Sequence, residues 1–105
     1  MSTIHTMLVV NATLTIDPAT RAEFIAAAIT MQQASQAEAD CHHYVFAADL
    51  ERDELFHIAE KWTDQAALDA HFATPHMAVF QQALAGSVKG AKATKYEIAS
   101  EAPLR

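Results

Sequence analysis

The chain has 105 residues, the length of one domain, and 51% of them are apolar, so a compact core is expected. Its formal net charge of −6 argues against binding to nucleic acids or anionic membranes, because both require an excess of lysine and arginine. The single cysteine, Cys41, excludes an intramolecular disulfide and fits a reducing compartment.

The start of the chain and its hydropathy favour a cytoplasmic location. Residues 1–5 carry no basic leader-like region. No apolar run approaches the roughly eighteen residues that a membrane-spanning helix needs. We therefore expect a cytoplasmic protein that has no membrane partner.

The first predicted element is a β-strand over residues 6–16. Apolar and small polar residues alternate there, and valine and threonine dominate. Neither side of the strand carries a charge, which predicts a central strand. Asp17 and Pro18 then form an N-cap and a first helical residue, and apolar residues recur at helical spacing, so a helix is predicted over residues 18–38.

Two further strands are predicted over residues 41–50 and 55–62, joined by a strongly charged connection. The second of them places Phe56, Ile58, Glu60 and Trp62 on one face. A carboxylate on such an apolar face is desolvated and needs a hydrogen-bond donor. A structural anchor is therefore the first interpretation of Glu60, with a catalytic role as the alternative.

A second helix is predicted to begin at Thr63 or Asp64 and to break at Thr74-Pro75, where a capping residue again precedes a proline. It restarts there and ends at Gly86. A last strand is expected over residues 91–99, with Tyr96 on its inner side.

The resulting order is β-α-β-β-α-β. This order predicts an α+β, ferredoxin-like fold with a four-stranded antiparallel sheet and helices on one face only. The other face also needs a cover, and a second copy of the same sheet is the simplest candidate. We therefore expect a homodimer that forms through the sheet faces.

The residue types exclude several kinds of site. With two glycines, the chain contains neither a phosphate loop nor a dinucleotide fingerprint. Six histidines suggest metal binding, but none forms a His-x-x-x-His or Cys-x-x-Cys pattern, and a helix break separates His71 from His76. No metal site is therefore predicted. Cys41 could be a nucleophile beside a histidine, but an inert strand cysteine is the expected role.

A small-molecule site between helices and sheet is the remaining candidate. His71 and His76 border apolar helix faces, where a histidine usually completes the core but can also carry a proton for a pocket. Together with Asn11, Tyr44 and Trp62, they would make a mainly apolar pocket with a few polar groups. Such a pocket suits an aromatic ligand.

Four short motifs resemble those of the antibiotic biosynthesis monooxygenase family, and most closely its quinol monooxygenase branch. These motifs are Cys41-x-x-Tyr44, Glu60-x-Trp62, Leu68-x-x-His71 and Thr74-Pro75-His76-Met77-x-x-Phe80. The resemblance covers nearly the whole chain. One departure is Asp40, which stands where the family commonly has glycine before the cysteine; Asp also tolerates unusual turn backbone.

The resemblance implies a dimeric α+β barrel that oxidises a quinol or another phenol with molecular oxygen, without metal, flavin or haem. The protein would bind the ring, remove a proton and hold the anion. The residues implied are His71 and His76 as candidate catalytic bases, and Asn11, Tyr44, Glu60 and Trp62 as candidate substrate-binding residues. Tyr44 and Trp62 would flank the ring, and Asn11 would hold an oxyanion.

Other functions on the same fold stay open. Haem-degrading relatives share an asparagine at the position of Asn11, but His71 stands where they have a tryptophan and no histidine follows Phe80, so haem degradation is less expected. A branch that isomerises an autoinducer phosphosugar shares the Thr-Pro-His motif. A non-catalytic small-molecule-binding or stress-response module would retain only the fold.

Overall fold

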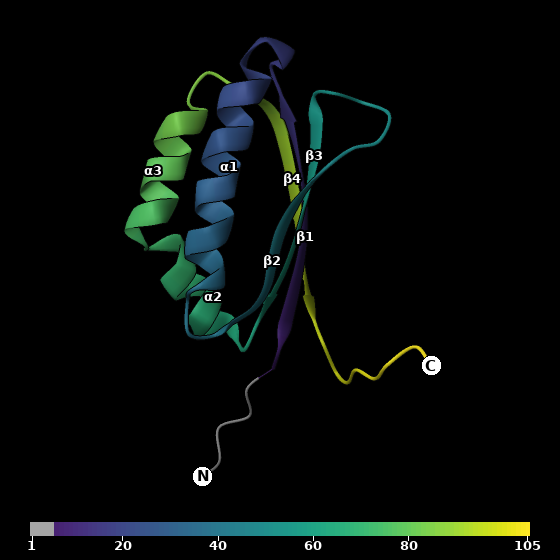
Figure 1. Cartoon of the computed structure of the whole chain (residues 1–105). Helices are drawn as coiled ribbons and strands as arrows, with labels where there is room; N and C mark the ends of the chain where they lie inside the picture. Colours follow the sequence, from purple (N-terminus) through teal and green to yellow (C-terminus); the bar gives the residue numbers. More distant parts are fainter. Residues whose placement is uncertain (1–5) are drawn as a thin grey trace.

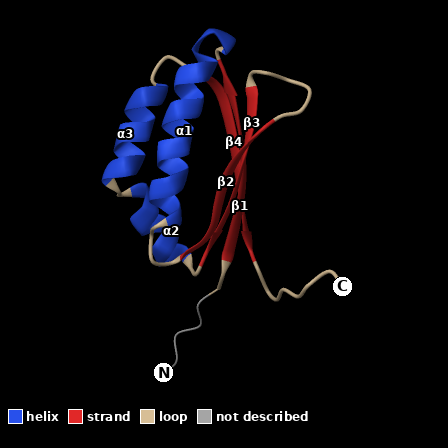
Figure 2. Cartoon of the chain, viewed as in Figure 1, coloured by secondary structure: helices blue, strands red, loops and turns tan. Residues whose placement is uncertain are grey.

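The computed structural model describes residues 6–105, so the leader expectation for residues 1–5 lies outside the described residues. The elements are β1 (Leu8–Ile16), η1 (Pro18–Thr20), α1 (Arg21–Gln36), β2 (Cys41–Ala48), β3 (Leu55–Trp62), α2 (Gln65–Phe72), α3 (Pro75–Leu84) and β4 (Val88–Glu97). All three α-helices lie on one side of the sheet (Figure 1), and the strands form the second layer (Figure 2). Within the described residues, no helix has both the length and the apolar character needed to cross a membrane.

The sheet has four antiparallel strands in the order β2-β3-β1-β4. This arrangement confirms the predicted α+β, ferredoxin-like fold and the central position of β1. The bounds of β3 are those predicted from the sequence. β2 ends at Ala48, earlier than expected, because the Asp49 carboxylate accepts hydrogen bonds from the backbone N–H groups of Glu51 and Arg52 and turns the chain there.

The predicted side of Tyr96 is wrong. Tyr96 lies opposite Val9 in the antiparallel register, whereas Leu8 and Val10 are the β1 residues that face the helices. Because side chains alternate along a strand, Tyr96 lies on the face of the sheet away from the helices. Its side is set by the pairing register of β4, which starts at Val88 rather than at residue 91.

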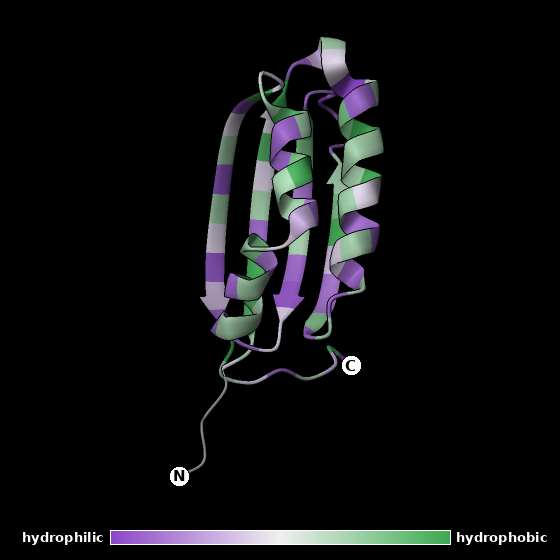
Figure 3. Ribbon diagram, turned by 90° about the vertical axis from the view of Figure 1, so that its left-hand side faces the viewer, coloured by the Kyte–Doolittle hydropathy of each residue, from purple (hydrophilic) through white to green (hydrophobic). Residues whose placement is uncertain are grey.

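The core lies between the sheet and the helices. The face of β3 that carries Phe56, Ile58, Glu60 and Trp62 is buried, as the alternation predicts, and Trp62 is completely buried. Phe24 of α1 packs against Phe56, with ring centroids 4.5 Å apart. Figure 3 looks onto the helices, which stand in front of the sheet and alternate between hydrophobic and hydrophilic positions.

Side-chain caps define where the helices begin. Asp17 is the N-cap of the short 3₁₀ turn η1 and accepts a hydrogen bond from the Ala19 N–H. The helix α1 begins directly after this turn, at Arg21. Asp64 caps α2 by accepting from the Ala67 N–H at 2.9 Å. The predicted break is also present, because α2 ends at Phe72 and α3 begins at Pro75.

Thr74 stabilises the break between α2 and α3 in two ways. Its hydroxyl donates to the backbone carbonyl of His71 at 2.8 Å and accepts from the Met77 N–H at 3.2 Å. One side chain therefore ends α2 and begins α3. This fixes the position of His71, in the last turn of α2, relative to His76, in the first turn of α3.

Replacing Gly86 by alanine is expected to destabilise the protein by about 1–2 kcal/mol. Gly86 has φ +82°, a left-handed conformation that penalises any Cβ atom, although the space around it is open. Gly90→Ala is the control, because a Cβ atom there meets only the Cβ atom of Thr15 at 3.9 Å and its φ lies outside the left-handed region. Urea unfolding measures both variants, and equal midpoints would contradict the expectation.

The face of the sheet without helices is exposed in the single chain. It contains a concavity of about 520 Å³ whose lining includes Asn11, Thr13, Val45 and Lys92. Its lining also includes the small apolar residues Ala12, Ala47 and Ala59. This face is referred to below as the open face.

Candidate active site

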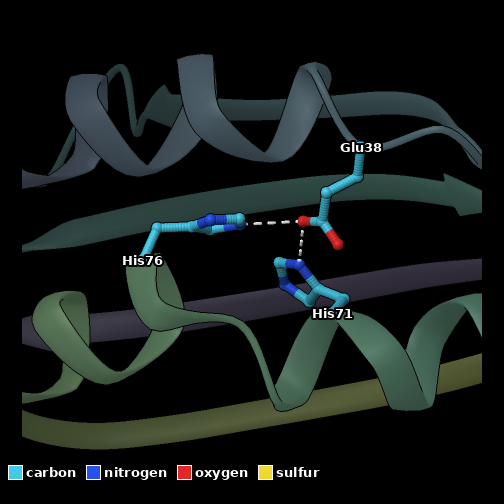
Figure 4. A group of neighbouring side chains, drawn as sticks. All are labelled: Glu38, His71 and His76. Carbon is cyan, nitrogen blue, oxygen red and sulfur yellow. Dashed lines mark hydrogen bonds and ion pairs between the residues drawn. The ribbon is translucent and has the colours of Figure 1, made fainter.

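Three side chains from the ends of three helices meet at one point (Figure 4). Glu38 lies in the turn after α1, His71 in the last turn of α2 and His76 in the first turn of α3. Glu38 Oε2 lies 2.7 Å from His71 Nδ1 and 2.8 Å from His76 Nε2. An ionised carboxylate only accepts, so each imidazole donates an N–H to the same oxygen. We call this group the Glu38–His71–His76 triad.

The triad runs from the core to the surface. The side chain of His71 is 1% exposed, whereas those of Glu38 and His76 are 17% and 22% exposed. The His71 ring packs against Trp62, with centroids 4.6 Å apart, and against Tyr44, with centroids 5.3 Å apart. His71 is therefore enclosed in the core, whereas Glu38 and His76 are the members that a small molecule can reach.

An apolar pocket of about 290 Å³ lies between α1 and α3, and His76 forms part of its wall. Its other walls include Met31, Val79, Phe80 and Ala83. Among the described residues that line it, His76 alone can take up a proton. Among the hydrogen bonds of residues 6–105, His76 takes part through Nε2, and none is formed by its Nδ1.

Glu60 and Trp62 lie on β3, next to the triad. The Trp62 indole Nε1–H donates to Glu60 Oε1 at 2.9 Å, which supplies the donor that the buried carboxylate requires. Burial raises the pKa of Glu60, while the bond from Trp62 and the charge of a protonated His71 partly oppose this shift. The contact fits the expected role of Glu60 as a structural anchor.

Tyr44 is the aromatic neighbour of both Trp62 and His71. Its side chain is buried, and its ring meets the Trp62 ring edge-on, with centroids 6.3 Å apart. Burial raises the pKa of its phenol strongly, and the nearby charge of Glu60 adds to the increase. This shift favours the protonated phenol, and the Tyr44 ring packs against the ring of His71.

Asn11 lies apart from this group, so the structure does not bring it together with the two histidines in the single chain. It pairs with Ala59 and Thr94 across the sheet and lies along the concavity of the open face. The triad lies on the helix side, and the sheet separates the two. The one residue that matched the haem-degrading pattern therefore lies away from both histidines.

Cys41 shows the features of an inert cysteine. Its thiol is half-buried and donates to the backbone carbonyl of His43 at 3.5 Å. Burial raises the pKa of the thiol, which lowers the fraction present as the reactive thiolate. The structure therefore gives no support to the alternative of a cysteine nucleophile.

Glu38 is the residue that the sequence analysis missed. It lies 33 positions before His71 and 38 before His76, so no local spacing links it to either histidine. The only sequence signal is its position just ahead of the Cys41-x-x-Tyr44 motif. The two histidines were identified individually, but the carboxylate that joins them was not.

Replacing Glu60 by glutamine is expected to change how stability depends on pH. The folded pKa is raised, so the folded protein keeps a proton that the unfolded chain releases near the ordinary value of 4.5. Wild-type stability is therefore lost as pH rises above that value, and Glu60→Gln avoids this loss while its amide oxygen still accepts from Trp62. Urea unfolding at pH 4 and pH 7 tests this, and parallel changes in the two proteins would disprove it.

The fold and the triad together define a class of protein. It is an α+β, ferredoxin-like protein in which a carboxylate-supported histidine borders an apolar pocket. Residues 7–83 match the family described as antibiotic biosynthesis monooxygenase. The chain therefore belongs to the antibiotic biosynthesis monooxygenase family.

Individual relatives agree with this assignment. The chain is 37% identical over 73 residues to sll1783 of Synechocystis sp., an uncharacterised protein, covering 70% of this chain and 50% of that protein. It is 32% identical over 74 residues to YcnE of Bacillus subtilis (strain 168), which carries a provisional name as a monooxygenase, covering 70% of this chain and 78% of YcnE. The chain thus spans about half the length of the Synechocystis relative.

A solved structure shows the same architecture. The crystal structure of PA3566 from Pseudomonas aeruginosa superposes with a TM-score of 0.86 at 26% identity, covering 94% of this chain and 100% of that one. The family and the provisional name of YcnE suggest a monooxygenase-like function.

Proposed function

We propose that the protein is a cofactor-independent monooxygenase that oxidises a quinol or another phenolic aromatic molecule with O₂. The observation that carries the proposal is the position of His76. Its ring forms part of the wall of the apolar pocket, and its Nε2 is held by Glu38. A base at the edge of an aromatic-sized pocket is what removal of a phenolic proton requires.

The proposed reaction begins with binding of the ring between α1 and α3, against Met31 and Phe80. Because Nε2–H of His76 donates to Glu38, the free electron pair of the ring is on Nδ1, which accepts the phenolic proton. The Glu38 carboxylate then stabilises the imidazolium that forms. The base role falls to His76, since the more deeply buried His71 acts through Glu38.

Deprotonation makes the ring electron-rich enough to transfer an electron to O₂ directly. One oxygen atom enters the ring and the other leaves as water, so a quinol and O₂ give a hydroxyquinone and water. We propose no metal, flavin or haem for this step, and O₂ is the co-substrate. This part of the proposal is supported by the family resemblance of the four motifs.

An oxygen electrode tests the proposed activity. Tag-free, chelator-treated protein is supplied with a panel of quinols and anthrones, and oxygen uptake matched by product formation is the expected result. Uptake no faster than in buffer alone would refute the activity for those compounds. Thermal stabilisation by the same compounds without uptake would identify the non-catalytic binding module instead.

We further propose that two copies associate through their open faces as a dimeric α+β barrel. The support is that this face lacks helices, carries small and apolar residues such as Val45 and Ala59, and is concave. Val45→Glu, which places a charge there, is expected to give a folded monomer in light scattering. A monomeric wild-type protein at micromolar concentration would refute the dimer.

We also propose a cytoplasmic location, supported by the single cysteine.

A further inference from the structure

We propose that the Glu38–His71–His76 triad is also a binding site for a divalent transition-metal ion, and that the bound ion switches off the base. The donor set is two imidazole nitrogens and one carboxylate oxygen. Imidazole is a suitable ligand for Zn²⁺, Co²⁺, Ni²⁺ and Fe²⁺, and all four ions can bind at a site that has no thiolate ligand. Mg²⁺ and Ca²⁺, which prefer a shell of oxygen ligands, are not expected to bind.

The three donor atoms already lie close together. Glu38 Oε2, His71 Nδ1 and His76 Nε2 are all within 4.8 Å of one another. A metal ion bound at about 2.1 Å to each would hold neighbouring donors roughly 3.3 Å apart. Glu38 Oε2 now lies 2.7 and 2.8 Å from the two nitrogens, so the carboxylate must move outward by about half an ångström to admit the ion.

The surroundings favour one open coordination position. His71 is fixed by Trp62 and Tyr44 and therefore presents Nδ1 in a set direction. Glu38 and His76 are partly exposed, so an ion can enter from their side and retain water or bind a ligand there. Three protein ligands with an open position are typical of metal sites that exchange small molecules.

Metal binding would move the imidazole hydrogen of His76 from Nε2 to Nδ1. In the metal-free protein Nε2 donates to Glu38 and Nδ1 holds the free electron pair. An ion that binds Nε2 takes the electron pair there and leaves the hydrogen on Nδ1. Nδ1 then donates and no longer accepts, so it cannot remove a proton from a phenol. The metal-bound form is therefore a second, inactive state of the site assigned to the proposed function.

Titration of tag-free, chelator-treated protein with CoCl₂ tests the site without any substrate. We expect one Co²⁺ per chain, a visible d–d absorption band, and a higher melting temperature because the ion joins the ends of three helices. ZnCl₂ should displace the cobalt and remove the band. These readouts do not depend on oxygenase activity, so failure of the proposed function would leave them unchanged.

The variants His76→Gln, His71→Gln and Glu38→Gln are each expected to weaken Co²⁺ binding by about 100-fold or more. The matched control is His57→Gln, because His57 Nε2 lies 2.8 Å from Asp49 Oδ1 in a histidine–carboxylate pair that lacks a second histidine. His76 and Glu38 are partly exposed, so their variants test the site even if His71→Gln does not fold. No binding at about 1 mM metal, or binding that only His57→Gln abolishes, would overturn the proposal.

Discussion

Replacing His76 by glutamine is expected to lower the rate of oxygen uptake with a productive phenol by about 10²- to 10⁴-fold, the usual contribution of a general base. A glutamine amide can still donate to Glu38, so the hydrogen bond now 2.8 Å long can be kept. The apolar wall formed by Val79 and Phe80 is unchanged, so KM should change much less than kcat. Steady-state kinetics with an oxygen electrode give both values.

A second histidine provides the control for this variant. His42 is exposed, and its Nε2 lies 2.8 Å from the Thr63 hydroxyl, away from the pocket between α1 and α3. His42→Gln should therefore retain the wild-type rate. If His76→Gln turned over at the wild-type rate, His76 would not be the base, and the assignment would pass to His71 or fail.

Replacing Trp62 by alanine is expected to destabilise the fold by about 3–5 kcal/mol, the largest effect we expect for a single side chain. The indole is completely buried, and His71 and Tyr44 both pack against it. The cavity is only part of the cost, because Glu60 also loses the N–H that donates to its buried carboxylate. Thermal unfolding should show a melting temperature lower by at least about 12 °C.

The variant Trp62→Phe distinguishes the contribution of aromatic packing to stability from that of the hydrogen bond to Glu60. Phenylalanine keeps most of the aromatic packing but cannot donate to Glu60, so a smaller loss of about 1–3 kcal/mol is expected. Leu50→Ala is the control, since Leu50 is fully exposed in the connection between β2 and β3 and should change stability by less than about 0.5 kcal/mol. A loss in Trp62→Phe as large as in Trp62→Ala would contradict the expected contribution of aromatic packing.

Local chemistry explains why much of the fold could be predicted. The bounds of β3, the cap at Asp64 and the break at Thr74-Pro75 each depend on residues within a few positions of one another. The side of Tyr96 depends instead on how β4 aligns with β1, two strands separated by most of the chain. A shift of one residue in that alignment reverses every side chain, and nothing local in residues 91–99 fixes it.

The site was only partly predictable for a similar reason. His71 and His76 stood out because each borders an apolar helix face and can carry a proton for a pocket. Glu38, by contrast, is an ordinary carboxylate at a helix end until the fold brings it to them. Asn11 was grouped with the histidines because its strand was expected to border the pocket and because a family pattern includes it, but alternation along β1 directs it to the opposite face from Val10. Contacts between distant segments, which decide both cases, leave no periodic signal.

The break at Thr74 has a geometric consequence for the triad. On one continuous α-helix, two residues five positions apart would point about 140° away from each other and lie about 7.5 Å apart along the axis. No single carboxylate oxygen could then reach both imidazoles. By changing the direction of the chain between His71 and His76, Thr74 and Pro75 turn two divergent side chains into a convergent pair. A substitution that joined α2 and α3 into one straight rod would therefore dismantle the triad while leaving all three of its members in the chain.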